Sequence, residues 1–359
     1  MSFLLYGEPL FRICKETSFS LLINSVKIAM LSLLVTVCDK FQDNREDCIS
    51  TICSRKDTRR NMQEKKSIWM VLGAGFCWGI IGVFSKPLGQ LGYSPFQITA
   101  LRCLVTLLGL TGILIIKDMG LFAIRIKDVW MFIGTGIFSI VLFNVCYFYT
   151  IAISTLGLAA ILLYTAPFFV MLLSAALYGE TITKRKVIAL FTAFAGCVMV
   201  TGLGGTNVSG LAIITGLGSG IGYALYTIFG NKALETYQPL TVTFYTFLFA
   251  LIGILPFSHV KELLHKLLEE GQSGKGILYG LLLGVISTLL PFILYTEGLK
   301  KLEPSKASVL AFAEPFIATL AGIIVFKERV TPLGILGLAC IFLSICMMNR
   351  KTTEITLEN

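Results

Sequence analysis

Ten long apolar segments follow one another after residue 66, separated by short polar loops. A helix needs about 20 mainly apolar residues to cross the ~30 Å hydrocarbon core of a bilayer. The segments are continuously apolar and rich in glycine and alanine, so they lack the alternation expected of strands. We therefore predict an all-α polytopic membrane protein with ten transmembrane helices, at residues 67–88, 95–116, 129–151, 156–178, 187–203, 210–230, 240–257, 276–298, 306–326 and 332–348.

The chain also contains an internal repeat. Pro167 and Pro315 are 148 residues apart, and so are Glu180 and Glu328. Near the start of each half, four similar residues recur at an offset of 145, namely Gly73, Gly75, Trp78 and Phe84 before Gly218, Gly220, Tyr223 and Phe229. The matched positions favour a duplication over a chance similarity between apolar helices.

We predict two five-helix repeats, at residues 67–203 and 210–350, followed by a cytoplasmic tail at 351–359. Because five is odd, the second repeat enters the membrane from the side opposite to the first. Inverted repeats with a binding site at their interface recur among secondary transporters, since exchanging the conformations of the two halves alternates access to the site.

Residues 1–61 are expected to form an N-terminal extension, either poorly ordered or containing one extra hydrophobic helix. The apolar stretch at 20–38 includes Lys27, and a central lysine costs roughly 3 kcal/mol of insertion. Met62 opens a short basic lead into the first clear span, which suggests that the native protein starts there.

Basic residues in the loops predict the orientation, because positive loops stay in the cytoplasm. With Lys66 inside, the inner segments carry 18 Lys and Arg residues and the outer loops carry six. Both ends of the ten-helix unit are therefore expected in the cytoplasm, with the chain in the plasma (inner) membrane. The longest outer loop contains a leucine face at 263–268 opposite charged residues, which indicates a short helix on the membrane surface.

Composition changes this picture little. Charged residues make up 14% of the chain and hydrophobic residues 55%, whereas soluble proteins carry roughly 25% charged residues. The net charge of +9 comes from short clusters between spans, so we expect no binding to nucleic acid.

Sequence motifs for enzymes and cofactors are absent. The segment 271–276 lacks the first glycine of a Walker A loop, and the only histidines are His259 and His265, in an outer loop. Six of the ten cysteines lie within predicted spans without a CxxC pair, which is typical of helix packing. We expect no enzyme, no cofactor and no metal site.

Several features together resemble the drug/metabolite transporter superfamily, in its EamA-type permease branch. They are the ten spans, a glycine-rich first helix with Trp78, Arg102 in the second helix, and the proline-to-glutamate pattern repeated from Pro167 and from Pro315. The resemblance covers residues 67–350. It implies two EamA repeats, a cavity between the first four helices of each half, peripheral fifth and tenth helices, and export of amino acids or related metabolites as a common activity.

Glu314 is the strongest candidate for a transport role. It is expected within the ninth span directly before Pro315, and an ionisable side chain there by default indicates a functional site. The first half has Ala166 at this position, so the halves are not chemically symmetric. A buried carboxyl group could bind and release protons. The alternative is that Glu314 only links helices by hydrogen bonds.

Other candidates are weaker. Arg102 could bind a carboxylate of the substrate, pair with Glu314, or extend to the membrane surface. Aromatic and polar residues on the helices that the resemblance places around the cavity suit an amphipathic metabolite, although each could equally be packing. The full set of predicted substrate-binding residues is Trp78, Arg102, Asn144, Tyr147, Tyr164, Tyr223, Tyr226, Tyr295 and Glu314.

Glu180 and Glu328 are expected at helix ends, close to Lys184 and Arg329, as caps or ion pairs. Gly75 with Gly79, and Gly216 with Gly220, are expected to allow close helix packing.

We conclude that the sequence predicts a secondary transporter of small metabolites that works by alternating access, with proton coupling as an option. The alternatives are a membrane channel and a small-molecule sensor without transport. The expected partners are a small-molecule metabolite, the lipid bilayer and, as an option, a second copy of the chain in a homodimer.

Overall fold

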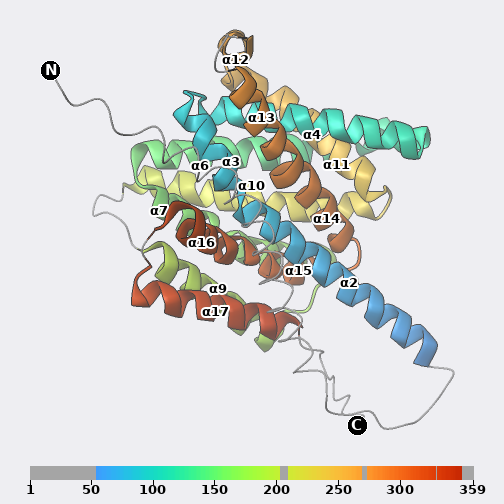
Figure 1. The fold of residues 1–359 in the computed structure, drawn as a ribbon. Helices are drawn as coiled ribbons and strands as arrows, with labels where there is room; N and C mark the ends of the chain where they lie inside the picture. Colours follow the sequence, from blue (N-terminus) through green and yellow to red (C-terminus); the bar gives the residue numbers. More distant parts are fainter. Residues whose placement is uncertain (1–53, 203–208, 269–272, 329, 350–359) are drawn as a thin grey trace. The chain divides into compact units, whose positions relative to one another are not determined.

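The computed structural model describes residues 54–202, 209–268, 273–328 and 330–349, apart from the side chains of 54–61 and 273. The predicted extension at 1–61 lies almost wholly outside the described residues, as does the tail at 351–359. Every regular element in the described ranges is helical (Figure 1).

The helices of the first repeat follow the predicted spans closely. They are α2 (Ser54–Gly79), α3 (Ile81–Gln90), α4 (Pro95–Lys117), α5 (Val129–Ile133), the π-helical η3 (Gly134–Val141), α6 (Leu142–Ile153), α7 (Leu156–Leu163), α8 (Ala166–Tyr178) and α9 (Lys184–Thr201), with short 3₁₀ turns η1 (Met119–Phe122) and η2 (Ile126–Asp128).

The second repeat has a similar order of spans. It consists of α10 (Gly210–Leu234), α11 (Pro239–Ile254), the 3₁₀ turn η4 (Leu255–Phe257), α12 (Val260–Leu268), α13 (Ser273–Gly284), the π-helical η5 (Val285–Leu289), α14 (Leu290–Leu299), α15 (Pro304–Leu310), α16 (Ala313–Phe326) and α17 (Pro332–Asn349). Each repeat thus has a π-helical segment in its third span and a broken fourth span. Such shared irregularities support the repeat that the sequence predicts.

Nine helices of the described residues are long and apolar enough to cross a bilayer. They match nine of the ten predicted spans. The remaining predicted span, 187–203, corresponds to α9, which opens with Lys184, Arg185 and Lys186 and has only a short apolar stretch after them. The protein is therefore an all-helical, multi-pass membrane protein, and the number of ten spans stays a prediction.

Polar residues at the helix starts explain several boundaries. Ser94 caps α4 by accepting a hydrogen bond from the Gln97 amide, while the Gln97 side chain accepts one from the Ser94 amide. Pro95 follows at the first helical position, where its missing N–H costs nothing. Thr183 and Ser209 cap α9 and α10 by accepting hydrogen bonds from the amides of Lys186 and Ala212.

Large apolar side chains cover much of the outer surface, including Leu108, Leu172 and Ile335, which are 60% exposed or more. A soluble protein would bury such residues, whereas in a bilayer they face lipid. This distribution supports the assignment to the membrane.

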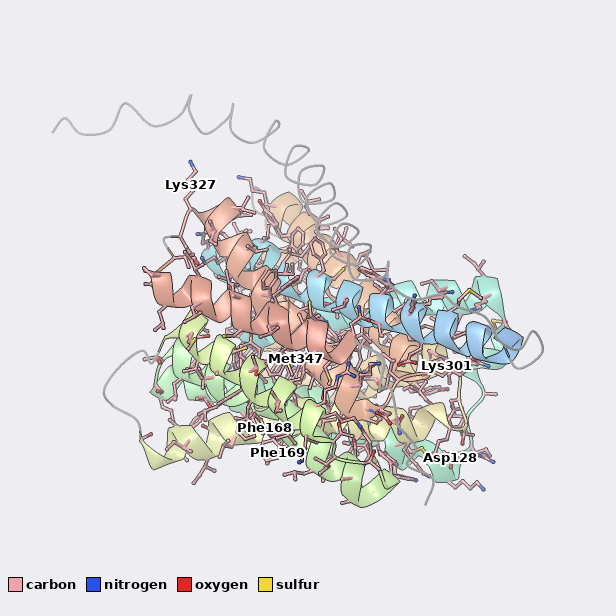
Figure 2. All side chains as sticks on the ribbon, turned by 90° about the horizontal axis from the view of Figure 1, so that it is seen from below. Asp128, Phe168, Phe169, Lys301, Lys327 and Met347 are labelled. Atoms are coloured by element: carbon pink, nitrogen blue, oxygen red, sulfur yellow. The ribbon has the colours of Figure 1, made fainter. Side chains whose placement is uncertain are left out.

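The last helices of the two repeats pack along each other. Helices α9 and α17 lie side by side at the lower edge of the view in Figure 1. The hydroxyl of Ser344 in α17 donates a hydrogen bond to the carbonyl of Ala189 in α9 across 2.6 Å. Phe168 and Phe169 of α8 are labelled in Figure 2, and Phe168 packs edge-to-face on Phe191 of α9.

Each first helix of a repeat packs tightly on the broken span of the other repeat. A Cβ added at Gly79 would lie 2.6 Å from Ile317 Cβ, and one at Gly75 would lie 2.8 Å from Ala313 Cβ. In the other half, a Cβ at Gly216 would overlap Leu162, and one at Gly220 would lie 2.6 Å from Thr165 Oγ1. The predicted role of these glycines in close packing is confirmed.

The predicted surface helix is present as α12. Leu263 is buried against the bundle, whereas Leu264 and Leu268 are exposed. The Nζ of Lys266 donates hydrogen bonds to the Gly92 carbonyl (2.6 Å) and to Gln97 Oε1 (3.2 Å), so α12 is fixed to the turn between α3 and α4.

Candidate functional site

The fourth span of the first repeat is interrupted at Tyr164 and Thr165, between α7 and α8. Pro167 lies in the first turn of α8, where its lack of an N–H prevents a continuous helix from α7. The Thr165 hydroxyl donates to the Leu162 carbonyl across 2.6 Å and so partners one of the carbonyls at the break. This break is a place where backbone can line a cavity within a membrane.

The ninth predicted span has a matching interruption at Ala311 and Phe312, between α15 and α16. Glu314 and Pro315 occupy the first turn of α16, and the Glu314 amide donates to the Ala311 carbonyl across 2.9 Å. Glu314 therefore stands within the ninth predicted span, as expected, and the structure places it at the start of a half-helix.

The two breaks face a common pocket. Its lining combines residues of both repeats, among them Tyr164, Ala166, Pro167, Tyr223, Ser308 and Glu314. The cavity measures about 20 Å³, which is enough for a single water molecule. A metabolite of amino-acid size requires the surrounding helices to move apart.

Glu314 supplies the carboxylate of this pocket. Tyr223, on the first helix of the second repeat, donates a hydrogen bond from its hydroxyl to Glu314 Oε2 across 3.2 Å. Arg102 interacts with Glu314 electrostatically, but it forms none of the ion pairs within the described ranges. The carboxylate is therefore held by a neutral hydroxyl and remains available to a cation or a proton.

Aromatic rings surround the pocket. Trp78 lies 6.5 Å from Tyr223 and 5.3 Å from Tyr295, measured between ring centroids. Tyr164 contacts Phe312 at 6.1 Å across the two helix breaks. Tyr147 packs on Phe143, which in turn meets Tyr223 at 5.7 Å. The structure thus brings Tyr164, Tyr223 and Glu314 into the pocket and places Trp78 and Tyr147 in the rings behind it.

Three other predicted binding residues already have partners in the protein. Tyr226 shares a hydrogen bond of 2.6 Å with Thr296, and Tyr295 shares one of 2.8 Å with Thr227. Asn144 donates to the Ile140 carbonyl and accepts from Thr99. Apart from the bond of Asn144 to Ile140, which lies within one span, these bonds connect different helices, and none of the three residues lines the pocket in this conformation.

Arg102 is placed apart from the pocket lining. Its Nε is buried without a hydrogen-bond partner. A buried guanidinium nitrogen without an acceptor is costly, so Arg102 retains the capacity to bind an anionic group.

The glutamates at the helix ends have partners that the sequence did not indicate. Glu180 pairs with Lys186, which is buried, and not with Lys184, which is exposed at the first position of α9. Glu328 pairs with Lys86 across 3.2 Å. Arg329, the expected neighbour of Glu328, lies outside the described residues.

The pocket lining also includes residues that the sequence does not single out, namely Leu163, Ser308, Ala311 and Phe312. Ser308 lies two turns before Glu314, and Phe312 sits in the helix break itself. A comparison of the two breaks at the 148-residue offset would have indicated the region, since both carry small residues beside an aromatic one.

Known proteins of similar sequence match nearly the whole described chain. The EamA-like transporter family matches residues 65–202 and 210–350. A protein named as an uncharacterized transporter from Archaeoglobus fulgidus is 30% identical over 287 residues, which cover 80% of this chain and 99% of that protein. The uncharacterized transporter YwfM of Bacillus subtilis is 25% identical over 296 residues, 79% of this chain and 95% of the relative.

A solved crystal structure shares the fold. Its TM-score is 0.66 at 18% sequence identity, and the match covers 79% of this chain and 96% of that chain. The repeated helical architecture and the two sequence matches agree with each other. The chain belongs to the EamA-like transporter family, as a membrane transporter built from two EamA repeats.

Proposed function

We propose that the protein is a secondary carrier that moves small metabolites across the membrane by alternating access, with the pocket between the two helix breaks as its binding site. The observation that carries this proposal is the position of Glu314. It is a carboxylate at the start of a half-helix, in a pocket whose walls come from both repeats. A site between inverted repeats can open to one side or the other when the halves exchange conformations.

The small size of the pocket supports a carrier over an open pore. Room for about one water molecule is too little for a metabolite, so transport requires helix movement. The tight glycine contacts between each first helix and the opposite broken span provide surfaces along which the halves can slide.

The chemistry of the lining suggests the substrate class. Glu314 can bind an ammonium group, and the rings of Tyr164 and Tyr223 can pack on an apolar body. Arg102 can bind a carboxylate if the helices rearrange. We propose amino acids or related compounds as substrates, with export as the direction and Glu314 as the group that couples transport to protons.

The charges of the loops bear on the orientation of the carrier in the membrane. We propose a plasma-membrane protein with ten spans, and the excess of Lys and Arg on one side of the spans favours both ends of the unit in the cytoplasm.

Uptake by vesicles containing the purified protein tests this proposal. A panel of radiolabelled amino acids and related metabolites is measured with and without a pH gradient, for the wild type, Glu314→Gln and the control Glu235→Gln. Glu235 forms an exposed ion pair with Lys232 far from the pocket lining. We expect saturable, gradient-driven flux in the wild type and the control and its loss in Glu314→Gln. Equal flux in all three would contradict coupling through Glu314, and no flux in any would contradict a carrier that acts alone.

A further inference from the structure

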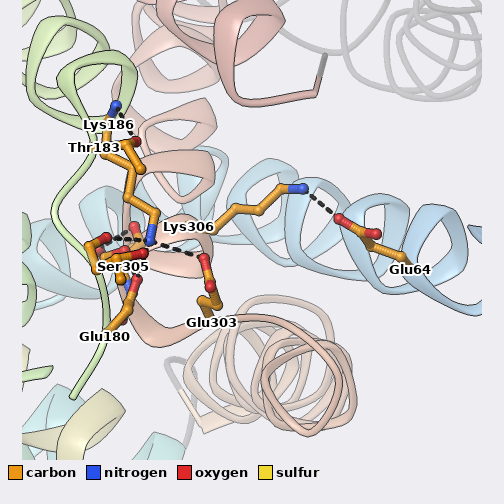
Figure 3. Close-up of polar contacts among 9 residues, drawn as sticks. Glu64, Glu180, Thr183, Lys186, Glu303, Ser305 and Lys306 are labelled. Carbon is orange, nitrogen blue, oxygen red and sulfur yellow. Dashed lines mark hydrogen bonds and ion pairs between the residues drawn. The ribbon is translucent and has the colours of Figure 1, made fainter. Parts of the chain in front are cut away.

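A buried polar cluster joins the two broken spans at one end of the bundle (Figure 3). Glu180 follows the C-terminal end of α8, and Ser305 stands in the first turn of α15. Glu180 accepts hydrogen bonds from both the hydroxyl and the amide of Ser305, the latter across 3.3 Å. One carboxylate therefore connects the end of the first repeat's broken span to the start of the second repeat's broken span.

Lys186 neutralises this carboxylate. Its Nζ lies 2.7 Å from Glu180 Oε1 and 2.8 Å from Glu303 Oε2, and it also donates to the Thr181 carbonyl across 2.9 Å. The side chains of Lys186 and Glu180 are only 8% and 7% exposed. Removing one partner of such a pair leaves an uncompensated buried charge. The ion pair between Glu180 and Lys186 therefore favours the arrangement in which both side chains stay in contact.

A second ion pair extends the cluster to the first span. Lys306, next to Ser305, donates to Glu64 Oε1 of α2 across 2.6 Å (Figure 3). The end of the bundle that carries Glu180 is thus linked across α2, α8 and α15.

Among the residues that the structure describes, the opposite end shows no equivalent cluster, although the repeat would place one there. Glu328 is the counterpart of Glu180, at an offset of 148 residues. The counterparts of Ser305 and Lys186 at the same offset are Gly157 and Gly334, which have no side chain to bond.

Glu328 instead pairs with Lys86, and these two side chains are 58% and 54% exposed. Exposed pairs of this kind contribute little because water and salt screen them. The two ends of the bundle are therefore held with very different strength.

The cluster stands on the same two helices as the pocket. Helices α8 and α15 pack against each other, with Pro167 at the start of α8 and Ser308 in α15 both lining the pocket. A path from the pocket to the Glu180 end requires α8 and α15 to separate, which breaks the bonds between Glu180 and Ser305.

We propose that Glu180, Lys186 and Ser305 form a gate that closes the pocket toward the side of the membrane on which Glu180 lies, predicted to be the cytoplasm. This inference rests on the proposed carrier function. The gate has to open and re-form in each transport cycle. The opposite end, where Gly157 and Gly334 stand at the corresponding positions, opens without a comparable barrier.

Accessibility of the pocket tests the gate independently of any substrate. In the full chain with its ten native cysteines replaced by alanine, Ser308→Cys reports the pocket through its labelling rate with a membrane-impermeant maleimide. Lys301→Cys, at an exposed position in the loop before α15, identifies the side of the membrane on which Glu180 lies. The rate is then compared in Glu180→Gln, Ser305→Ala and the matched control Glu328→Gln.

We expect Glu180→Gln and Ser305→Ala to raise the labelling rate from the Glu180 side by about ten-fold, the change produced by losing about 1.4 kcal/mol of gate stability. Glu328→Gln is expected to leave the rate from that side unchanged. Ser305→Ala keeps every charge in place, so it remains informative if Glu180→Gln does not fold. Unchanged rates in the folded variants, or an equal rise in the control, overturn the gate.

The failure of the gate and the failure of the carrier are separable. Saturable flux in vesicles together with unchanged Ser308→Cys labelling would contradict the gate and support the carrier function. A ten-fold rise in labelling without flux for any substrate would support the cluster as the closure of the pocket and contradict the carrier function.

Discussion

Tyr223 and Glu314 are 91 residues apart in the chain, and the Tyr223 hydroxyl donates a hydrogen bond to Glu314 Oε2 across 3.2 Å. This bond links the first helix of the second repeat to the half-helix that begins at the pocket. It gives Glu314, the one carboxylate among the described residues that line the pocket, a neutral partner, and a cationic substrate or a proton can still bind to this carboxylate.

Replacement of Tyr223 by phenylalanine removes this bond and keeps the ring. A hydrogen bond to a charged group is worth about 1.5–3 kcal/mol, so we expect the apparent affinity for the transported substrate to change by about ten-fold or more. The measurement is the concentration dependence of uptake in vesicles. The control is Tyr149→Phe, since Tyr149 is 47% exposed on the outer surface. Identical concentration dependence in both variants would remove Tyr223 from the site.

Gly79 allows the first span to contact α16. A Cβ there would lie 2.6 Å from Ile317 Cβ and 2.8 Å from the Glu314 carbonyl oxygen. Overpacking of this kind costs about 1–3 kcal/mol, so Gly79→Ala is expected to lower the midpoint of thermal unfolding in detergent. A Cβ at Gly82 meets no atom within 4 Å, and Gly82→Ala should keep or raise the midpoint. Equal midpoints for the two variants would show that the contact is not tight in the native protein.

Lys327 ends α16 with a φ of 53°, and it projects away from the ribbon in Figure 2. Its repeat counterpart, Gly179, ends α8 with a φ of 66°. A side chain in this left-handed region costs about 1 kcal/mol, which glycine avoids.

We therefore expect Lys327→Gly to stabilise the protein by about 1 kcal/mol and Gly179→Ala to destabilise it by a similar amount. Nothing lies within 4 Å of a Cβ at Gly179, so its effect reports the backbone alone. Thermal unfolding of the two variants checks the pair. Shifts of the same sign would contradict a shared left-handed cap.

Much of the fold could be predicted because the bilayer imposes length and composition on each span. The duplication was visible at Pro167 and Pro315, whose helix breaks occur at matching places in the two repeats. Glu314 stood out because an ionisable residue within a span needs a reason to be there.

Other features could not be predicted for a physical reason. A span is apolar on every side, so its sequence does not say which face meets another helix and which meets lipid. The sequence therefore does not separate Asn144, Tyr226 and Tyr295, which make hydrogen bonds between or within helices in this conformation, from the tyrosines that line the pocket. The partner of Glu180 depends on how α8 and α15 meet, and this relationship is not encoded in local spacing.

The central claim is that the pocket opens to one side of the membrane at a time. Counterflow tests it most directly: vesicles containing the purified protein are loaded with an excess of unlabelled substrate, and uptake of the labelled substrate from outside is followed. An alternating-access carrier predicts that the internal substrate transiently accelerates uptake and accumulates label above its external concentration. Uptake that is indifferent to the internal substrate and does not saturate would contradict the account and indicate a channel.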